Sequence, residues 1–213
     1  MISEHTAIAR TLSRLPDIVS AQSLMHDTDA RTWRYDALCG RLIELSSADA
    51  AASLTATTTL IAQAQREGEP VAWVTTEESC VYPPDLSEQG IDLDALIVVR
   101  IGTTTDVPRA AEKLVQSGAF GLIVRDLVER AHIPTPLLAR LMQLARKHAT
   151  VVVCLTVKPS DEESLSSLVS LRGEARRIRR EGVIYRFEVH ALKNKRGSPW
   201  RHTEQCHGPM GLR

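Results

Sequence analysis

Residues 40–68 read GRLIELSSADAAASLTATTTLIAQAQREG, and they decide the fold. An apolar run, Leu42–Leu45, is followed by a short loop of small residues, a helical stretch and a polar turn, Gln65–Gly68. A second apolar run, Val71–Val74, comes after that turn. Strand, small-residue loop, helix and strand is the order of the unit in which P-loop proteins hold a triphosphate. The stretch therefore predicts an α/β fold built on a nucleotide-binding unit.

The loop itself lacks the residue types that bind phosphate. In a working P-loop, glycines leave backbone N–H groups open to the phosphates, a lysine neutralises them and a Ser or Thr hydroxyl holds Mg²⁺. Here the two glycine positions are Ser47 and Ala52. The lysine position is Ser53 and the hydroxyl position is Leu54. We therefore predict a degenerate P-loop that binds no ATP, in a protein that has no cofactor and is not an enzyme.

The stretch resembles, without a gap, the first nucleotide-binding unit of the RecA recombinases, G-R-[IV]-[VI]-E-[IL]-x-G-P-E-x-S-G-K-T-T. Further segments resemble later motifs of that family in the same order along the chain: Val74–Glu77, Gly90–Leu96, Ser117–Asp126, Ser170–Ile178, Leu192–Lys195 and Pro199–Trp200. The resemblance covers residues 38–212. It implies a RecA-like core, which is a mainly parallel sheet flanked by helices on both faces, with a C-terminal antiparallel hairpin and an N-terminal helix.

The chain departs from the RecA pattern where RecA binds ATP and DNA. Glu77 and Asp126 match catalytic carboxylates, but without a bound triphosphate we expect no catalytic role for either. The segments Arg125–Leu138 and Lys158–Leu168 are shorter than the two DNA-binding loops of the family. In the apolar run Val151–Val157, valine replaces the glutamine that senses the γ-phosphate. The resemblance thus implies a RecA core without its ATP site or DNA loops.

Within that superfamily the chain is most similar to the ImuA family of small RecA-like partners in bacterial damage-induced mutagenesis. This resemblance implies a non-catalytic accessory protein of SOS-induced mutagenic translesion DNA synthesis. Its partners would be RecA, an ImuB-like polymerase-family protein and an error-prone polymerase. The SulA cell-division inhibitors, which are also RecA-like without ATPase chemistry, give an alternative function, the binding of FtsZ.

The 26 basic and 26 acidic residues are unevenly divided along the chain. Residues 172–213 hold 11 Lys and Arg against 4 Asp and Glu, a net charge of +7, so the rest of the chain carries −7. The cationic positions concentrated there include Arg176, Arg177, Arg179, Arg180, Lys193, Lys195 and Arg196. We expect these side chains to contact RecA or a polymerase partner, or to make nonspecific contacts with DNA phosphates. A solvated basic hairpin that pairs with the acidic body is an equally open interpretation.

One core domain, residues 37–213, is expected after an N-terminal helix and linker, residues 1–36. Short apolar runs predict strands at 41–46, 70–75, 96–101, 120–125 and 150–156, and helical spacing predicts helices at 54–66, 82–89, 107–117 and 134–148. The basic extension, residues 172–213, is expected to contain a hairpin. In its second arm Tyr185, Phe187 and Val189 alternate with polar residues, which predicts one buried face.

The four cysteines are widely separated and form no C-x-x-C pair, which favours a reduced, cytoplasmic protein without disulfides. No apolar run approaches the roughly 18–20 residues of a membrane span, so no membrane contact is expected. His202, Cys206 and His207 lack a second half-site, so no metal is expected either. Cys154 and Trp200 are expected to be buried.

Overall fold

The structure, a computed structural model, describes residues 33–47, 50–77, 81–103, 105–126, 133–181 and 184–207. The core unit of the chain comprises Trp33–Arg213 and is separate from residues 1–32. The predicted N-terminal helix and most of the predicted linker lie outside the described residues. The core unit begins at Trp33, earlier than residue 37, because Trp33 is fully buried and donates a hydrogen bond from Nε1 to the Ala56 carbonyl over 3.0 Å.

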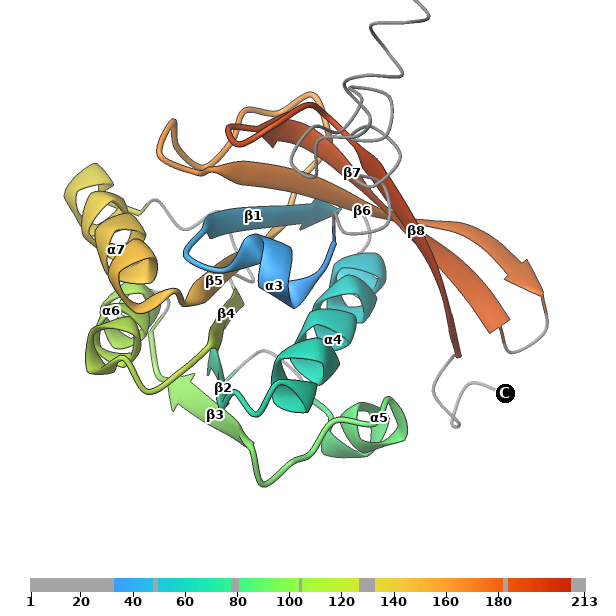
Figure 1. Cartoon of the computed structure of the whole chain (residues 1–213), viewed down its shortest axis with the longest axis horizontal. Helices are drawn as coiled ribbons and strands as arrows, with labels where there is room; N and C mark the ends of the chain where they lie inside the picture. The colour runs from blue at the N-terminus through green and yellow to red at the C-terminus, as the bar shows by residue number, and fades with distance from the viewer. Residues whose placement is uncertain are drawn as a thin grey trace, which may run out of the picture. The chain divides into compact units, whose positions relative to one another are not determined.

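One eight-stranded sheet forms the centre of this unit, in the order β3-β2-β4-β5-β1-β6-β7-β8 (Figure 1). Its strands are β1 (Leu42–Ser47), β2 (Val71–Thr76), β3 (Leu96–Ile101), β4 (Leu122–Asp126), β5 (Val151–Val157), β6 (Leu171–Glu181), β7 (Ile184–Asn194) and β8 (Arg201–His207). The pairings among β1 to β6 are all parallel, whereas β7 pairs antiparallel with both β6 and β8. The predicted α/β class and mainly parallel sheet are therefore confirmed. The sequence pattern does not indicate β8, because its side chains are mostly polar.

Helices cover both faces of the parallel part of the sheet (Figure 1). The described helices are α3 (Tyr35–Leu38), α4 (Ala50–Arg66), α5 (Pro83–Glu88), α6 (Val107–Ser117) and α7 (Thr135–His148). Successive strand residues alternate between two apolar layers, so Ile43 packs in the layer that contains α4 and α5 while Leu42 packs in the layer that contains α6 and α7. Cys154 is fully buried and Trp200 nearly so, as predicted. None of the helices in the described ranges is long and apolar enough to cross a membrane.

The C-terminal hairpin extends beyond the parallel sheet (Figure 1). Only the first residues of β6 pair with β1, from Leu171 opposite Ile43 to Glu174 opposite Ser46. From Ala175 onward, the pairing partner of β6 within the described residues is β7 alone. The predicted alternation in the second arm is confirmed, since the buried residues are Tyr185, Phe187, Val189 and Ala191. We call Ala175–Glu181 the β6 extension.

Candidate functional site

The site that corresponds to a P-loop lies between β1 and α4. Ser47 is the last residue of β1, and α4 already begins at Ala50, before the second glycine position. Ala52 and Ser53 are therefore inside the helix, with exposed fractions of 1% and 5%. Leu54 packs against the apolar layer beneath the helix. The residues at the lysine and second glycine positions thus face the protein interior.

The two carboxylates that match catalytic positions lie at the ends of neighbouring strands. β2 pairs with β4, and Glu77 follows β2 whereas Asp126 ends β4. Glu77 is exposed. The Thr75 hydroxyl donates to Asp126 Oδ2 over 3.5 Å. Because β2 and β4 are parallel neighbours, both acids lie at the carboxyl ends of the strands. This is where the predicted nucleotide-binding unit has its ligand.

A buried carboxylate that the sequence pattern did not single out organises the neighbouring loop. Glu44, in β1, is fully buried and forms an ion pair with Lys158, whose Nζ lies 2.5 Å from Glu44 Oε1. Glu44 also accepts hydrogen bonds from the Thr156 hydroxyl at 3.2 Å, and from the Ser164 hydroxyl and the Leu165 N–H at 2.9 Å each. These bonds fasten the loop 158–169 to β1. Glu44 is the only charged residue in the strand β1, and this feature of the sequence could have indicated a buried carboxylate.

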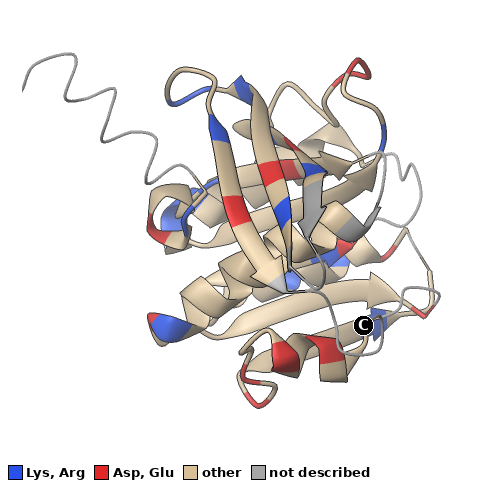
Figure 2. Ribbon diagram, turned by 90° about the vertical axis from the view of Figure 1, so that its right-hand side faces the viewer, with Lys and Arg blue, Asp and Glu red and all other residues tan. Residues whose placement is uncertain are grey.

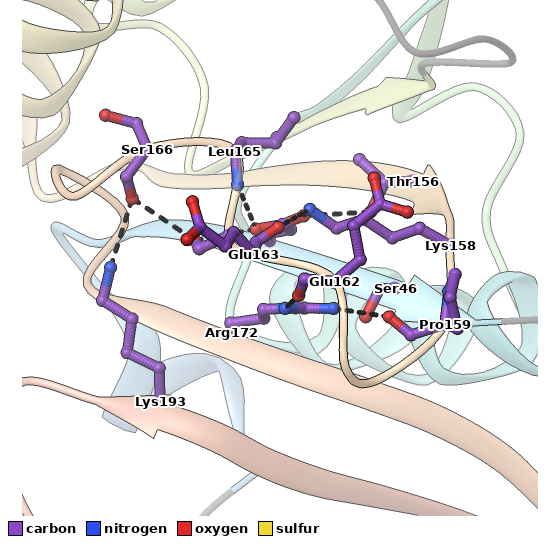
Figure 3. Close-up of polar contacts among 12 residues, drawn as sticks. Ser46, Thr156, Lys158, Pro159, Glu162, Glu163, Leu165, Ser166, Arg172 and Lys193 are labelled. Carbon is purple, nitrogen blue, oxygen red and sulfur yellow. Dashed lines mark hydrogen bonds and ion pairs between the residues drawn. The ribbon is translucent and has the colours of Figure 1, made fainter.

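Cationic side chains also bind the loop 158–169. Figure 3 shows the side chains of Arg172 and Lys193 directed at the loop 158–169, whose first residue is Lys158. Arg172 donates to the Pro159 carbonyl over 2.9 Å and also to the Glu162 carbonyl. Each bond gives a loop carbonyl a donor in place of water, so no buried carbonyl is left without a hydrogen bond. The loop is therefore held by charge-assisted hydrogen bonds.

Lys193 and Lys195 also bind this loop. Lys193 donates to the Ser166 carbonyl over 3.1 Å, and Lys195 donates to the Ser167 carbonyl. Burial, with the charge of Lys195 nearby, lowers the pKa of the Lys193 ammonium. Two of the cations predicted to contact a partner are thus engaged within the chain.

Arg196, a third predicted contact residue, holds the start of β1. It donates to the carbonyls of Cys39 and Gly40 over 3.3 and 3.1 Å. Beside it, Arg41 donates to the Ser170 carbonyl, and burial followed by the charge of Arg196 lowers the pKa of Arg41 to about 10. Arg196 therefore also has a structural role.

Arg176 and Arg177 do not lie on one face of the hairpin. Arg176 is paired with Glu174 over 2.7 Å, with its own side chain 55% exposed. Arg177, the next residue, lies over the Tyr185 ring with its guanidinium carbon 4.7 Å from the ring centre. Consecutive strand residues point to opposite faces, so these two cations do too. The remaining two lie in the same strand, with Arg179 opposite Arg186 and Arg180 opposite Tyr185 in the backbone register.

A second buried charge that the sequence pattern did not single out is Arg125, in β4. Its side chain is fully buried and donates from Nη1 to the Cys154 Sγ over 3.6 Å. Nε and Nη2 have no hydrogen-bond partner among the residues that the structure describes. Burial raises the pKa of the Cys154 thiol. In register, Arg125 lies beside Cys154 and Cys154 beside Glu44, so a polar row crosses three central strands.

Metal ligands are not assembled within the described part of the chain. His202 Nε2 lies 3.3 Å from Glu204 Oε2, and Cys206 is buried. Across those residues, no group of three His, Cys, Asp or Glu side chains could hold a metal ion. The side chain of His207 lies outside the described set.

Comparisons with known proteins agree with this architecture. The family model of the RecA N-terminal domain matches residues 17–150. Protein RecA of Leifsonia xyli subsp. xyli is 29% identical over 203 residues, which covers 78% of this chain and 56% of that protein. Protein RecA of Clavibacter michiganensis subsp. michiganensis is 29% identical over 202 residues, with the same coverage. Protein RecA of Corynebacterium pseudotuberculosis is 36% identical over 90 residues, 42% of this chain. The chain thus spans little more than half the length of the first two relatives.

Proposed function

Because this chain belongs to the family of the RecA N-terminal domain, we propose that it is a non-catalytic RecA-like accessory protein of damage-induced mutagenic translesion DNA synthesis, of the ImuA type. It acts by contact with RecA, with an ImuB-like polymerase-family protein or with an error-prone polymerase. It keeps the RecA-like architecture and does not hydrolyse ATP.

The burial of Ser53 inside α4 carries this proposal. A triphosphate needs open backbone N–H groups and a cation at this point of the βα unit. At the corresponding positions, Ala52 is 1% exposed and Ser53 is 5% exposed, and the helix has already begun at Ala50. A RecA-family fold that binds no triphosphate retains a RecA-like surface, which supports a role in protein–protein contact.

The loop 158–169 supports the same conclusion. It stands where the resemblance places the second DNA-binding loop of RecA, and it is short. Glu44, Arg172 and Lys193 bind its backbone or its side chains. These bonds oppose any rearrangement of the loop around a DNA strand. The contact surface that we assign to partners is therefore the β6 extension, with Arg176 and Arg177.

The experiment measures the DNA-stimulated ATPase and strand exchange of RecA with and without this chain. Its variant replaces Arg176, Arg177, Arg179 and Arg180 by Ala. A matched control replaces four exposed cations on α6 and α7, namely Arg109, Lys113, Arg146 and Lys147, by Ala. We expect the chain to change RecA activity, the hairpin variant to lose the effect and the control to keep it.

Three outcomes would contradict the proposal. Hydrolysis of ATP by this chain alone would contradict the proposal that it is non-catalytic. Absence of binding to RecA and to polymerase partners would contradict the proposal that it acts by contact with them. Capture of FtsZ alone in a parallel binding assay would favour the SulA-like alternative.

A further inference from the structure

The guanidinium of Arg125 is buried and has a single hydrogen bond to the residues that the structure describes. Arg125 follows Ile123 by two positions in β4, and Ile123 packs in the layer between the sheet and the helices α6 and α7. Both side chains therefore point into this layer. Nη1 donates to Cys154 Sγ over 3.6 Å, and a thiol sulfur is a weak acceptor. Nε and Nη2 have no partner among the described residues, so most N–H donors of Arg125 lack an acceptor.

The positive charge of Arg125 is also unbalanced within the described part of the chain. The nearest acid in register on the same face is Glu44, but Cys154 stands between them and Glu44 is already paired with Lys158 over 2.5 Å. Asp126, the next residue, points to the opposite face because strand residues alternate. Burial raises the pKa of the Cys154 thiol, so this group stays neutral and supplies no negative charge.

The acidic residues of other elements lie away from this guanidinium. Figure 2 shows Asp and Glu on the short helix and the loop at the lower end of this view. Asp92 and Asp94 are exposed just before β3 begins, at the amino ends of the parallel strands, whereas Arg125 stands next to the carboxyl end of β4. On α6, Glu112 is paired with Arg140 over 2.6 Å. These acids therefore do not supply the counter-charge of Arg125.

A second buried polar group without a described partner lies on the same face of the sheet. Thr76 ends β2 and is 4% exposed, and its hydroxyl has no hydrogen-bond partner among the described residues. Val74 pairs with Arg125 in the register of β2 and β4, so Thr76 lies two positions further toward the carboxyl end on the face of Arg125. Two residues along a strand and one strand across separate their Cα atoms by about 8 Å. A ligand of one or a few atoms can therefore contact both side chains.

We propose that Arg125 and Thr76 bind one chloride ion in the layer between the sheet and the helices α6 and α7. The guanidinium and the hydroxyl both donate to the ion, which gives each unpartnered group an acceptor. The single negative charge of chloride balances the single positive charge of Arg125, whereas a water molecule would leave that charge buried and unpaired. Sulfate and phosphate carry more charge and more acceptor oxygens than these two side chains satisfy, so the site favours a monovalent anion.

This site is distinct from the degenerate P-loop. The helix α4, which contains Ala52 and Ser53, packs in the other apolar layer, on the opposite face of the sheet. The inference goes beyond the proposed function, because it concerns an ion inside the core and not a contact with a partner protein. It makes the stability of the core depend on the anion in solution.

Urea unfolding of the full chain at constant ionic strength tests the proposal. Sodium gluconate is replaced stepwise by sodium chloride at a total of about 0.1 M, so that the Debye length stays at about 10 Å. A ligand that binds only the folded state raises the folded-to-unfolded ratio in proportion to one plus its concentration divided by its dissociation constant. For a dissociation constant of about 10 mM, the ratio should rise about tenfold between about 1 mM and about 100 mM chloride.

Three variants make the test specific to this site. Arg125→Met should lose the dependence on chloride and, without chloride, should be at least as stable as the unchanged chain, because no buried charge remains. Thr76→Val keeps the shape of threonine without its hydroxyl. One lost hydrogen bond weakens binding about fivefold, so the tenfold rise should fall to about threefold. Arg109→Met, at a position of α6 whose side chain is 78% exposed, is the control and should keep the tenfold rise.

The chlorine NMR linewidth measures binding directly. The line of a dilute chloride solution should broaden when the unchanged chain is added and should not broaden with Arg125→Met. Bromide should stabilise the chain as chloride does, and sulfate at the same ionic strength should not. Circular dichroism checks that each variant is folded. The proposal is overturned by a stability that does not change with chloride, by a dependence that folded Arg125→Met retains, or by an equal loss of the dependence in Arg109→Met.

Discussion

Lys158 Nζ lies 2.5 Å from Glu44 Oε1, and both side chains are almost completely removed from water. The pair joins the end of β5 to the centre of β1 and fixes the loop 158–169 between them. Removing two charges from water is costly, so a buried ion pair stabilises a fold only when its remaining donors and acceptors are bonded. Glu44 meets this condition through Thr156, Ser164 and Leu165.

Lys158→Met should lower the free energy of unfolding by about 3–5 kcal/mol, because it leaves the Glu44 carboxylate buried without its cation. Urea unfolding, followed by circular dichroism, measures the change. The double variant Glu44→Gln with Lys158→Met should lose less, since no buried charge remains. Lys147→Met, at an exposed position of α7, serves as the control and should change stability by less than about 0.5 kcal/mol. A loss in Lys158→Met no larger than in the control would contradict the structural role of the pair.

Gly118→Ala should lower the free energy of unfolding by about 1–3 kcal/mol. Gly118 ends α6 with φ of +68°, and a Cβ added there would lie 2.7 Å from Nδ1 of His148. Thermal unfolding of Gly118→Ala is compared with the same change in a His148→Ala background. The loss should be smaller in that background, because only the backbone strain remains. Equal losses in both would mean that the contact with His148 is not the cause.

The sequence predicted β1 to β5 because each is a short apolar run between turn residues. It did not predict that β6 pairs in parallel with β1, because β6 is rich in arginine. Strand β3 was expected at the residues where it occurs, 96–101, and β5 was expected within one residue of its observed end. The side-chain network could not be predicted in the same way. The partners of Glu44 are 112 to 121 residues away in the chain, and only the neighbouring positions of β1 and β5 bring them together.

For the cationic residues, neighbouring positions in the sequence did not predict neighbouring positions on the surface. Adjacent arginines in a sequence suggest one basic patch, but strand alternation separates Arg176 from Arg177 across the hairpin. Lys193 and Lys195 were expected to contact a partner or DNA, yet both donate to carbonyls of a loop that was expected only to be short. Composition identified the charge of the extension. It could not identify which cations the fold itself uses.

Arg125→Met should leave the free energy of unfolding unchanged or raise it by about 1–3 kcal/mol, because two buried guanidinium nitrogens lack partners among the described residues. Methionine has a flexible apolar side chain that can occupy the vacated space beside Cys154. Urea unfolding measures the difference, with Arg109→Met at an exposed position of α6 as the control. A loss of more than about 1 kcal/mol in Arg125→Met alone would show that the guanidinium has a stabilising partner.

Ser53→Lys combined with Leu54→Thr should not create an ATP site. The double variant supplies the cation and the hydroxyl of a P-loop, but Ser47 and Ala52 keep Cβ atoms at both glycine positions. Position 53 also stays inside a helix that begins at Ala50. Titration with a fluorescent ATP analogue and Mg²⁺ should therefore show a dissociation constant weaker than about 1 mM, with a RecA protein as the positive control. Micromolar binding by the double variant would mean that two side chains alone separate this chain from a working nucleotide site, and that the start of α4 does not prevent binding.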